Sequence, residues 1–479
     1  MISDAVLLAS PLVCPLIGAI AVFFFEQAKK FFLLAHLALS IALTFTVFES
    51  GTAATSVGNW LAPYGIVLIA DPFAALILTL SSLIFCSTVF FYRSKNLLPL
   101  LFFLQTGVTL SFISGDLFNL FVAFEIMLAS SYVILTVDGN KSYLDNAYSY
   151  LSMNISASFL YLIAIAVFYG YTGTLNMAAI ALIFKENHST LALIPVFAIF
   201  VVLMIKGGIF PLYFWLPDSY PLLSSPLGAL FGGILSKVGI YALFRLFLTL
   251  FPFADSSFGT LLLVLACLSM LLGVLGAVSK SSIKGILSYH ILSQGGYMIL
   301  GLSFATPLAV AGAIFFIFHN MVVKASLFLL GGLARKAGQE KSGPVFSSSP
   351  ILSLLFLLQA FSLSGLPPLS GFWGKYLLLV EGVELHAYGA VAIAILTSFF
   401  TLFSMIKIWN NIFLTEQKAI FSEVNSPRFS SALLLTLVAV SMGLFAQKSL
   451  EISSFAAKNL LDNRSYIAKS LESGTKGEK

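Results

Sequence analysis

Charged residues are scarce in this sequence, and their scarcity excludes a soluble globular protein. Only 9% of the 479 residues are charged and 59% are hydrophobic, whereas about 25% of an average soluble domain is charged. Apolar runs recur along the whole chain, and lipid is the solvent that satisfies them. In lipid the backbone must form helices or closed barrels, and these runs are too long and too uniformly apolar for barrel strands. The composition therefore predicts an all-α integral membrane protein.

Cysteine is also rare, which excludes two further kinds of site. The three cysteines stand singly in apolar runs, at Cys14, Cys86 and Cys267. Without ligand spacing they form neither a disulfide framework nor a zinc or iron–sulfur site, so we expect helix packing, no metal and no other cofactor. No basic residue precedes the first apolar run, which therefore lacks the start of a cleaved signal peptide. The net charge of +5 is spread over loops and predicts no nucleic-acid partner.

Apolar runs of roughly 17 to 25 residues predict about fourteen transmembrane helices. Their expected ranges are 5–25, 31–48, 66–91, 97–113, 116–136, 144–169, 191–216, 226–248, 258–278, 282–302, 306–331, 350–382, 386–411 and 430–446. We therefore divide the chain into a polytopic membrane domain, residues 1–446, and a polar, partly amphipathic C-terminal tail, residues 447–479.

Basic residues indicate how these helices are oriented. Lysine and arginine concentrate in the connections after odd-numbered helices, as at Lys29 and Lys280, whereas the other connections hold little beyond Lys185. The positive-inside rule places the odd connections in the cytoplasm and both termini outside. Six basic residues in the tail run against this rule. Polar and apolar residues alternate at helical spacing over residues 451–471, so we expect this segment to lie along the interface or against a neighbouring subunit. Residues 472–479 are expected to be disordered.

Two predicted helices are interrupted by proline in a similar way. Pro211 lies within 191–216, and Pro367 and Pro368 lie within 350–382; in both places Pro-Leu is followed by Phe-Trp. Proline removes a backbone donor and clashes one turn back. Paired broken helices in corresponding halves of a chain point to a transport pathway, although a simple kink is the alternative.

Seven ionisable residues fall well inside the predicted helices. They are Glu125, Lys206, Lys237, His290, His319, Lys324 and Lys375. Each lysine or glutamate at the bilayer centre costs about 2.5 to 3.5 kcal/mol, so several together indicate a use. Three other basic residues lie near helix ends and are expected to snorkel to the headgroups: Arg245, Lys284 and Lys407.

The acid and the first lysine of this set are expected to form a pair. Glu125 is one of few acids at its depth and Lys206 is its natural partner; a purely structural ion pair is the alternative. Pairing with a carboxylate favours the charged form of a buried lysine, so separating the two would let the lysine release its proton. Sodium prefers oxygen ligands, as other hard cations do, and lysines would repel it. The row is therefore predicted to carry protons.

The histidines are weaker candidates. His319 and Lys324 lie five residues apart on one predicted helix, which puts them only partly on one face. We expect both on the proton pathway. For His290, a place on the pathway and a role in packing remain equally open.

Five stretches of the chain then resemble a known family. They are residues 204–221 (MIKGGIFPLYFWLPDSYP), 235–241, 288–294, 319–324 and 365–375. In this order they resemble the antiporter-like subunits of respiratory complex I and of the multisubunit Mrp-type cation/proton antiporters, over roughly residues 66–411. Within the family, residues 118–121, 125–132 and 218–220 are most similar to the D-type subunits of Mrp antiporters.

The resemblance implies an architecture and a set of roles. It implies fourteen helices with two inverted five-helix repeats, helices four to eight (about 97–248) and nine to thirteen (about 258–411), with helices seven and twelve broken. It also implies a Glu–Lys pair coupled to a central lysine and an exit lysine. By matching position these are Glu125, Lys206, Lys237 and Lys375. Residues 222–226 and His290 depart from the family pattern.

Three classes of function compete at this point. The first is a proton-translocating subunit of a Mrp-type Na⁺/H⁺ antiporter, in a cell membrane and with other subunits of a hetero-oligomer as partners. The second is a proton-pumping subunit of an NADH:quinone oxidoreductase or a membrane-bound hydrogenase; with no redox motif, the chain would not itself be the oxidoreductase. The third is a scaffold, against which Glu125, Lys206, Lys237 and Lys375 argue.

Overall fold

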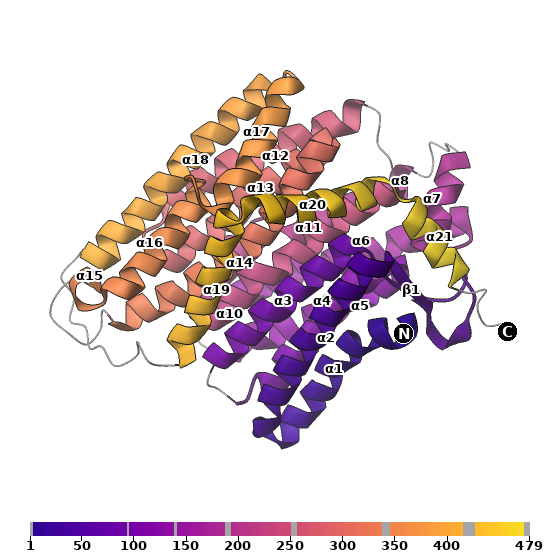
Figure 1. Cartoon of the computed structure of the whole chain (residues 1–479), viewed down its shortest axis with the longest axis horizontal. Helices are drawn as coiled ribbons and strands as arrows, with labels where there is room; N and C mark the ends of the chain where they lie inside the picture. Colours follow the sequence, from indigo (N-terminus) through magenta and orange to yellow (C-terminus); the bar gives the residue numbers. More distant parts are fainter. Residues whose placement is uncertain are drawn as a thin grey trace.

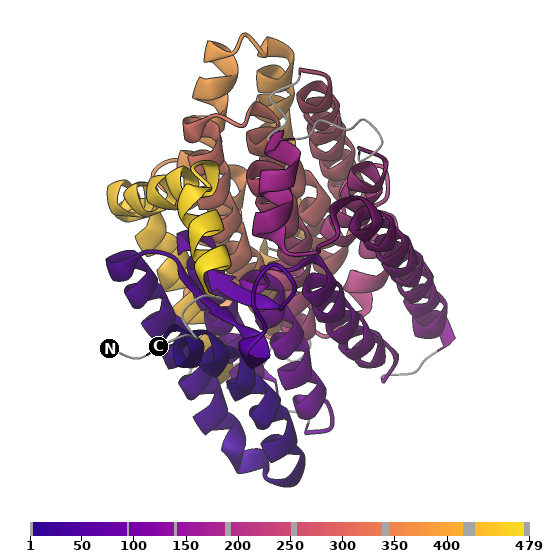
Figure 2. The same cartoon turned by 90° about the vertical axis from the view of Figure 1, so that its right-hand side faces the viewer.

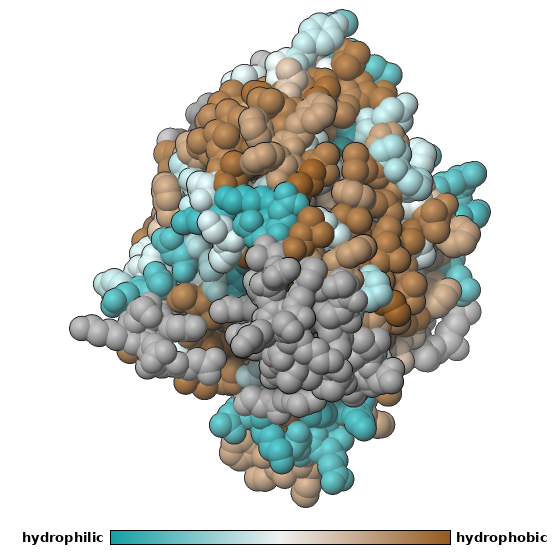
Figure 3. Space-filling model, turned by 90° about the vertical axis from the view of Figure 1, so that its left-hand side faces the viewer, coloured by the Kyte–Doolittle hydropathy of each residue, from teal (hydrophilic) through white to brown (hydrophobic). Residues whose placement is uncertain are grey.

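The chain forms a bundle of long, tilted helices with one small β-hairpin at its edge (Figures 1 and 2). This computed structural model describes residues 3–92, 95–137, 141–186, 193–250, 256–337, 345–414 and 427–473. The predicted all-α membrane fold is confirmed. Hydrophobic side chains cover much of the described surface on the face shown in Figure 3, as lipid contact requires.

The first half of the chain contains the hairpin and the helices up to residue 250. These elements are α1 (Asp4–Phe24), η1 (Glu26–Ala28), α2 (Lys29–Ser50), β1 (Ala53–Ser56), η2 (Val57–Asn59), β2 (Val67–Ala70), α3 (Pro72–Phe91), α4 (Leu98–Ile113), α5 (Leu117–Thr136), α6 (Lys141–Thr172), α7 (Met177–Glu186), α8 (Leu193–Gly207), α9 (Trp215–Ser219), η4 (Tyr220–Leu222), α10 (Ser225–Leu230), η5 (Phe231–Leu235), α11 (Ser236–Arg245) and η6 (Leu246–Leu250).

The second half is entirely helical over its described residues. Its elements are α12 (Ser256–Ser279), α13 (Ile283–Phe304), α14 (Pro307–Ala337), α15 (Val345–Ser348), α16 (Pro350–Ser364), α17 (Ser370–Glu384), α18 (Tyr388–Ile408), η7 (Trp409–Leu414), α19 (Pro427–Leu444), α20 (Ala446–Leu461) and α21 (Arg464–Glu472).

At least one helix overlaps each of the fourteen predicted ranges. By length and apolar composition, nine helices among the described residues can cross a membrane, or ten if the bent pair Arg428–Leu444 and Ala446–Leu461 is one span. Three more are apolar but shorter, namely Leu98–Ile113, Leu193–Gly207 and Pro350–Ser364. The number fourteen therefore stays a prediction.

The predicted start of the third helix is wrong. The helix expected from residue 66 begins at Pro72, because Val67–Ala70 form strand β2, antiparallel to β1 with Ala53 opposite Ala70. Asp71 is the N-cap of α3, where its carboxylate accepts the N–H of Ala74 at 2.9 Å. The strand is as apolar as the helix that follows it, so a hydropathy reading cannot separate them.

The prolines lie in two breaks between helices. α8 ends at Gly207, Gly208 takes a φ of +65°, and Pro211 lies before α9 begins. α16 ends at Ser364, Gly365 takes a φ of +90°, and Pro367 and Pro368 precede α17. Glycine tolerates this left-handed backbone, so both breaks start where the sequence permits one.

Two π-helical turns bracket α11. The π turn η5 directly precedes α11 and the π turn η6 directly follows it. All three belong to one continuous buried helical stretch from Ser225 to Leu250. π turns are rare and are frequently found at functional sites.

The C-terminal segment turns back over the bundle. The chain bends by 87° between α19 and α20, and α20 then crosses α14, α3 and η6 (Figure 1). Figure 2 places α21 beside the β-hairpin, which it contacts. The tail thus forms α20 and α21, which lie against this same chain. Most of the predicted disordered end, residues 474–479, lies outside the described residues.

Candidate functional site

The ionisable residues expected inside the membrane lie on six helices. Glu125 is on α5, Lys206 on α8, Lys237 on α11, His290 on α13, His319 and Lys324 on α14, and Lys375 on α17. Glu125 and Lys206 are half-buried, and the other five are 4% exposed or less. We call Lys206, Lys237, Lys324 and Lys375 the lysine row.

Glu125 and Lys206 do not form the expected direct ion pair. Although both residues are described, no contact within 4.0 Å joins the carboxylate and the ammonium. Lys206 Nζ donates to Ser158 Oγ of α6 at 3.4 Å and lies 5.6 Å from the centre of the Phe124 ring. Glu125 is still close enough for its charge to act on Lys206, so a small movement would close the pair.

The helix that carries Glu125 starts at a buried acid. Asp116 caps α5 by accepting the N–H groups of Phe118 at 2.8 Å and Asn119 at 2.9 Å. Burial raises the pKa of the Asp116 carboxyl to about 6, against which these two hydrogen bonds act. Asp116 lies just before the span, and sequence reasoning did not select it.

A small cavity lies between Lys206 and the helix of the next lysine. Its volume is about 30 Å³, which is room for one or two water molecules. Residues of α6, α8, α9 and α11 line it, among them Tyr150, Asn154, Lys206 and Trp215. Gly239 also lines it, and a Cβ there would meet the backbone of α8 at 2.5 Å, so only glycine lets the two helices come this close.

Lys237 is held by its own π turn. Its Nζ donates to the carbonyl of Gly232 in η5 at 2.7 Å and to Ser236 Oγ at 3.3 Å. The side chain is 1% exposed. Its partner is therefore a backbone carbonyl.

Lys324 occupies the middle of the row. Its Nζ donates to the carbonyl of Leu287 on α13 at 3.0 Å. The charges of Lys237 and Lys375 both act on it. His319, one turn earlier on α14, faces α17 instead, where its Nδ1 lies 2.8 Å from Ser370 Oγ. The two residues thus contact different helices.

Lys375 lies at the second helix break. Because α16 ends at Ser364, the carbonyls of its last turn lack helical partners, and Lys375 Nζ donates to those of Leu363 and Ser364, both at 3.1 Å. A third bond goes to Ser398 Oγ of α18 at 3.2 Å, and the ammonium lies 4.6 Å from the centre of the Tyr297 ring. The negative end of the α16 dipole also favours a cation there.

Several buried polar atoms near these lysines lack a protein partner among the described residues. Both amide atoms of Gln294 on α13 and both of Asn320 on α14 are unpaired. One nitrogen of each histidine is unpaired too, although His290 Nε2 lies 2.7 Å from Ser404 Oγ. Buried polar groups of this kind are usually satisfied by water.

Arg245 is buried inside the protein, and the prediction that it snorkels is wrong. Its guanidinium bonds both oxygens of Asp71, at 2.8 and 2.6 Å, and both side chains are buried. Lys284 and Lys407, also expected to snorkel, are half-buried and donate to backbone carbonyls. Sequence reasoning also missed His36, which is fully buried and contacts Ser82 and Gln105.

The described residues contain no group of three or more metal-ligating side chains. The cysteines are free and buried, at Cys14, Cys86 and Cys267. The site therefore consists of a half-buried acid, a row of lysines held mainly by carbonyls, two histidines and unpaired amides.

Comparison with known proteins identifies a matching family and similar sequences. Residues 114–401 match the family described as NADH:quinone oxidoreductase/Mrp antiporter, TM. A protein of Alkalihalophilus pseudofirmus, named as the D subunit of a Na(+)/H(+) antiporter, is 41% identical over 91% of this chain and 92% of its own. A protein of the same name from Bacillus subtilis is 34% identical over 95% of this chain and 97% of its own.

Solved structures share the fold. A chain in the Mrp complex from a Dietzia species is 29% identical and superposes with a TM-score of 0.89, over 98% of this chain and 100% of that one. A chain of respiratory complex I from Thermus thermophilus is 24% identical with a TM-score of 0.79, over 95% of this chain and 99% of that one, and indicates a common fold.

Proposed function

The chain belongs to the family of membrane subunits of NADH:quinone oxidoreductase and Mrp antiporters, and we propose that it is the D-type subunit of a multisubunit Mrp-type Na⁺/H⁺ antiporter. The relatives named as D subunits of Na(+)/H(+) antiporters support the exchanged cation, since they align along almost their whole length. The chain is then one transporter subunit in a multi-pass hetero-oligomer, rather than an enzyme. The likeness to complex I, at 22 to 24% identity, concerns the fold, so a proton-pumping role there ranks second.

One observation carries the proposal: three buried lysines share backbone carbonyls as partners. Lys237, Lys324 and Lys375 donate to main-chain oxygens, and none has a carboxylate within 4.0 Å among the described residues. A carboxylate strongly favours the charged lysine, whereas a carbonyl accepts a hydrogen bond from either form of the amine and favours the charged form less. These lysines can therefore take up and release protons in place.

The charges of neighbouring lysines couple these events. Lys237 and Lys375 both act on Lys324, and like charges in a low dielectric oppose one another. A proton that arrives at one lysine therefore promotes release from the next. Moving one charge through about 150 mV requires roughly 3.5 kcal/mol, a magnitude that pairing or separating buried charges can supply.

The path we propose follows the contacts in order. Glu125 controls the protonation of Lys206, and water in the cavity beside Lys206 connects it to Lys237. Lys324 comes next. Water held by the unpaired amides, together with His319 and His290, then leads to Lys375 at the break. The contacts do not set a direction, so protons can pass either way.

The finer architecture belongs to the same proposal. We propose fourteen helices in a membrane domain, residues 1–446, with inverted repeats over about 97–248 and 258–411. The breaks at Pro211 and at Pro367 and Pro368 support the repeat, because one lies in each half. Both termini are proposed to lie outside the cytoplasm, and the tail from residue 447 lies over the outer face.

Sodium is proposed to cross elsewhere in the complex. The lysine row repels it, and a hard cation needs several oxygen ligands. The other subunits of the antiporter are then both partners and the source of the sodium site.

The whole complex, expressed in a sodium-sensitive host, tests the function. Wild type should restore growth in NaCl and should collapse a preformed pH gradient in everted vesicles when Na⁺ is added. Glu125→Ala and Lys206→Ala should abolish both, while Lys185→Ala, at an exposed lysine of α7, should not. Full antiport in the first two variants would refute the path. Co-purifying flavin or iron–sulfur subunits would favour the redox alternative.

A further inference from the structure

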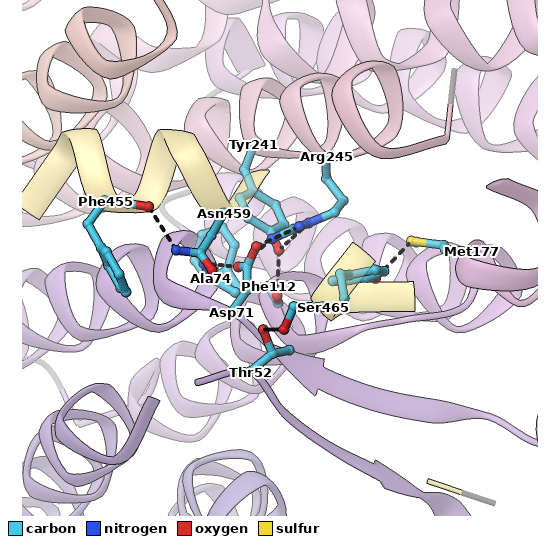
Figure 4. Close-up of polar contacts among 11 residues, drawn as sticks. Thr52, Asp71, Ala74, Phe112, Met177, Tyr241, Arg245, Phe455, Asn459 and Ser465 are labelled. Atoms are coloured by element: carbon cyan, nitrogen blue, oxygen red, sulfur yellow. Dashed lines mark hydrogen bonds and ion pairs between the residues drawn. The ribbon is translucent and has the colours of Figure 1, made fainter. Parts of the chain in front are cut away.

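A second buried charge cluster lies on the same helix as Lys237. Tyr241 and Arg245 follow Lys237 on α11 at intervals of four residues, so the three span about 12 Å of one side of the helix. Figure 4 shows Arg245 and Asp71 directed toward each other. The arginine makes a two-pronged bond to Asp71, and both residues are 3% exposed or less. Neither touches the lysine row.

The cluster connects α11 to two other transmembrane helices. Asp71 also caps α3, so the ion pair joins α11 to the start of that helix. Tyr241 Oη donates to the carbonyl of Phe112 in the last turn of α4 at 2.7 Å and accepts a bond from Arg245 Nε at 3.3 Å. One end of α11 is therefore fixed to α3 and α4 together.

The C-terminal tail covers this cluster. The ring of Tyr466 on α21 lies 4.9 Å from the guanidinium carbon of Arg245, a cation–π distance, and is itself 3% exposed. Asn463 donates to the carbonyl of Thr249 in η6 at 2.8 Å, and Ser465 bonds Thr52 at 3.4 Å beside the hairpin (Figure 4). The tail thus seals the ion pair and also binds the turn that follows α11.

The position of α11 needs such a fixed point. Its ten residues lie between two π turns, and a π turn that becomes an α turn shifts the adjoining segment along and around its axis. Any rotation would also move Gly239 away from the backbone of α8, where no side chain fits. Lys237 would then shift relative to the cavity that Gly239 lines and relative to Lys324.

We propose that the Asp71–Arg245 pair, covered by Tyr466, is a positioning element that aligns Lys237 with the cavity at Lys206 and with Lys324. This inference rests on the proposed function, since it concerns the same proton path. Among charged groups, Lys324 interacts with Lys237, and Lys206 lines the cavity that Val238 and Gly239 of the same helix also line. Arg245 faces Asp71, Tyr241 and Tyr466, and Asp116 also acts on Tyr466.

The test compares variants of the pair in the intact complex. Asp71→Asn keeps the helix cap but removes the charge. We expect antiport per assembled complex to fall about tenfold and the pH–activity profile to shift by about half a unit or more. Arg245→Lys keeps the positive charge but loses the two-pronged bond, so it should retain part of the wild-type antiport rate. Tyr466→Ala should resemble Asp71→Asn more weakly.

The control is an exposed ion pair on the same tail. Asp462 and Arg464 are paired and exposed, and Asp462→Asn should leave rate and profile unchanged. Immunoblotting of the assembled complex normalises each rate. An Asp71→Asn complex with the wild-type rate and profile, or a loss explained wholly by a smaller amount of complex, would overturn the proposal. Absence of antiport in the wild type would instead refute the proposed function.

Discussion

Substitution of Lys375 by arginine distinguishes a structural role from a role in proton transfer. Arginine can replace the lysine in its hydrogen bonds, but it cannot release a proton. The ammonium donates to the carbonyls of Leu363 and Ser364 and to Ser398 Oγ at 3.1 to 3.2 Å, and lies over Tyr297. Arginine carries the same charge and more donors, but it stays protonated in proteins. Lys375→Arg should therefore give an assembled complex without antiport.

Methionine at the same position should lose both properties. Two buried carbonyls and one hydroxyl would each lose their donor, at about 1 to 2 kcal/mol apiece, so Lys375→Met should destabilise the complex by about 3 to 6 kcal/mol. The larger guanidinium of Lys375→Arg should cost only about 1 to 3 kcal/mol through tighter packing. For either variant we expect antiport to fall about a hundredfold or more, the scale of a lost proton-transfer group.

The assays are thermal unfolding of the purified complex and Na⁺-driven dissipation of a pH gradient in proteoliposomes. Lys407→Met is the matched control, because Lys407 also donates to two backbone carbonyls, at 3.0 and 2.9 Å, but lies outside the lysine row. It should lower stability and leave antiport per complex intact. If Lys375→Arg transported at the wild-type rate, this lysine would not carry the proton.

Three further outcomes follow from the same contacts. Gln294→Leu should lower antiport about tenfold, because leucine cannot hold the water that the amide holds on the path; antiport at the wild-type rate would remove Gln294 from the path. Gly371→Ala would overlap a carbonyl of α16 and touch the His319 ring at 3.0 Å, so it should destabilise the complex by about 1 to 3 kcal/mol, unlike Gly389→Ala, which has open space. The carboxyl of Asp116 has a folded pKa of about 6, above the ordinary 3.8. Its contribution to the stability of the folded protein is therefore fully present below about pH 4, where the carboxyl is protonated, and is lost as the pH rises through about 6. Asp116→Asn should therefore raise the melting temperature at pH 8, by the equivalent of about 2 to 3 kcal/mol, with a gap that closes toward pH 5; equal melting temperatures at pH 8 would contradict the burial argument.

The membrane fold could be predicted because long apolar runs are satisfied by lipid. The lysines could be predicted because a charge inside such a run is unfavourable. A buried lysine in an apolar run stands out in the sequence, and all four members of the lysine row lie inside helices. The partners of these lysines could not be predicted, because three of the four donate to backbone carbonyls, two of them at a π turn or a helix break. Residue type carries no signal for such an acceptor.

The ion pair of Asp71 and Arg245 escaped for a different reason. Its members are 174 positions apart in the chain, each near the end of an apolar run, where a charge normally reaches the headgroups. The sequence predicts the approximate depth of each charge in the membrane. It does not predict the tertiary contacts with the hairpin and the tail. The same limit explains the start of α3, since the apolar residues Val67–Ala70 belong to a strand whose partner lies earlier in the chain.

The cover over Arg245 also sets an order of events during biosynthesis. Asp71 and Arg245 leave the ribosome long before Tyr466, so the ion pair must form, or wait unpaired at the edge of the bundle, until the tail arrives. Docking of α21 then covers the pair after α3 and α11 have been made. A fusion partner or tag attached beyond α21 would compete with that closing step, so a tag at the opposite end of the chain is the better choice for measuring assembly.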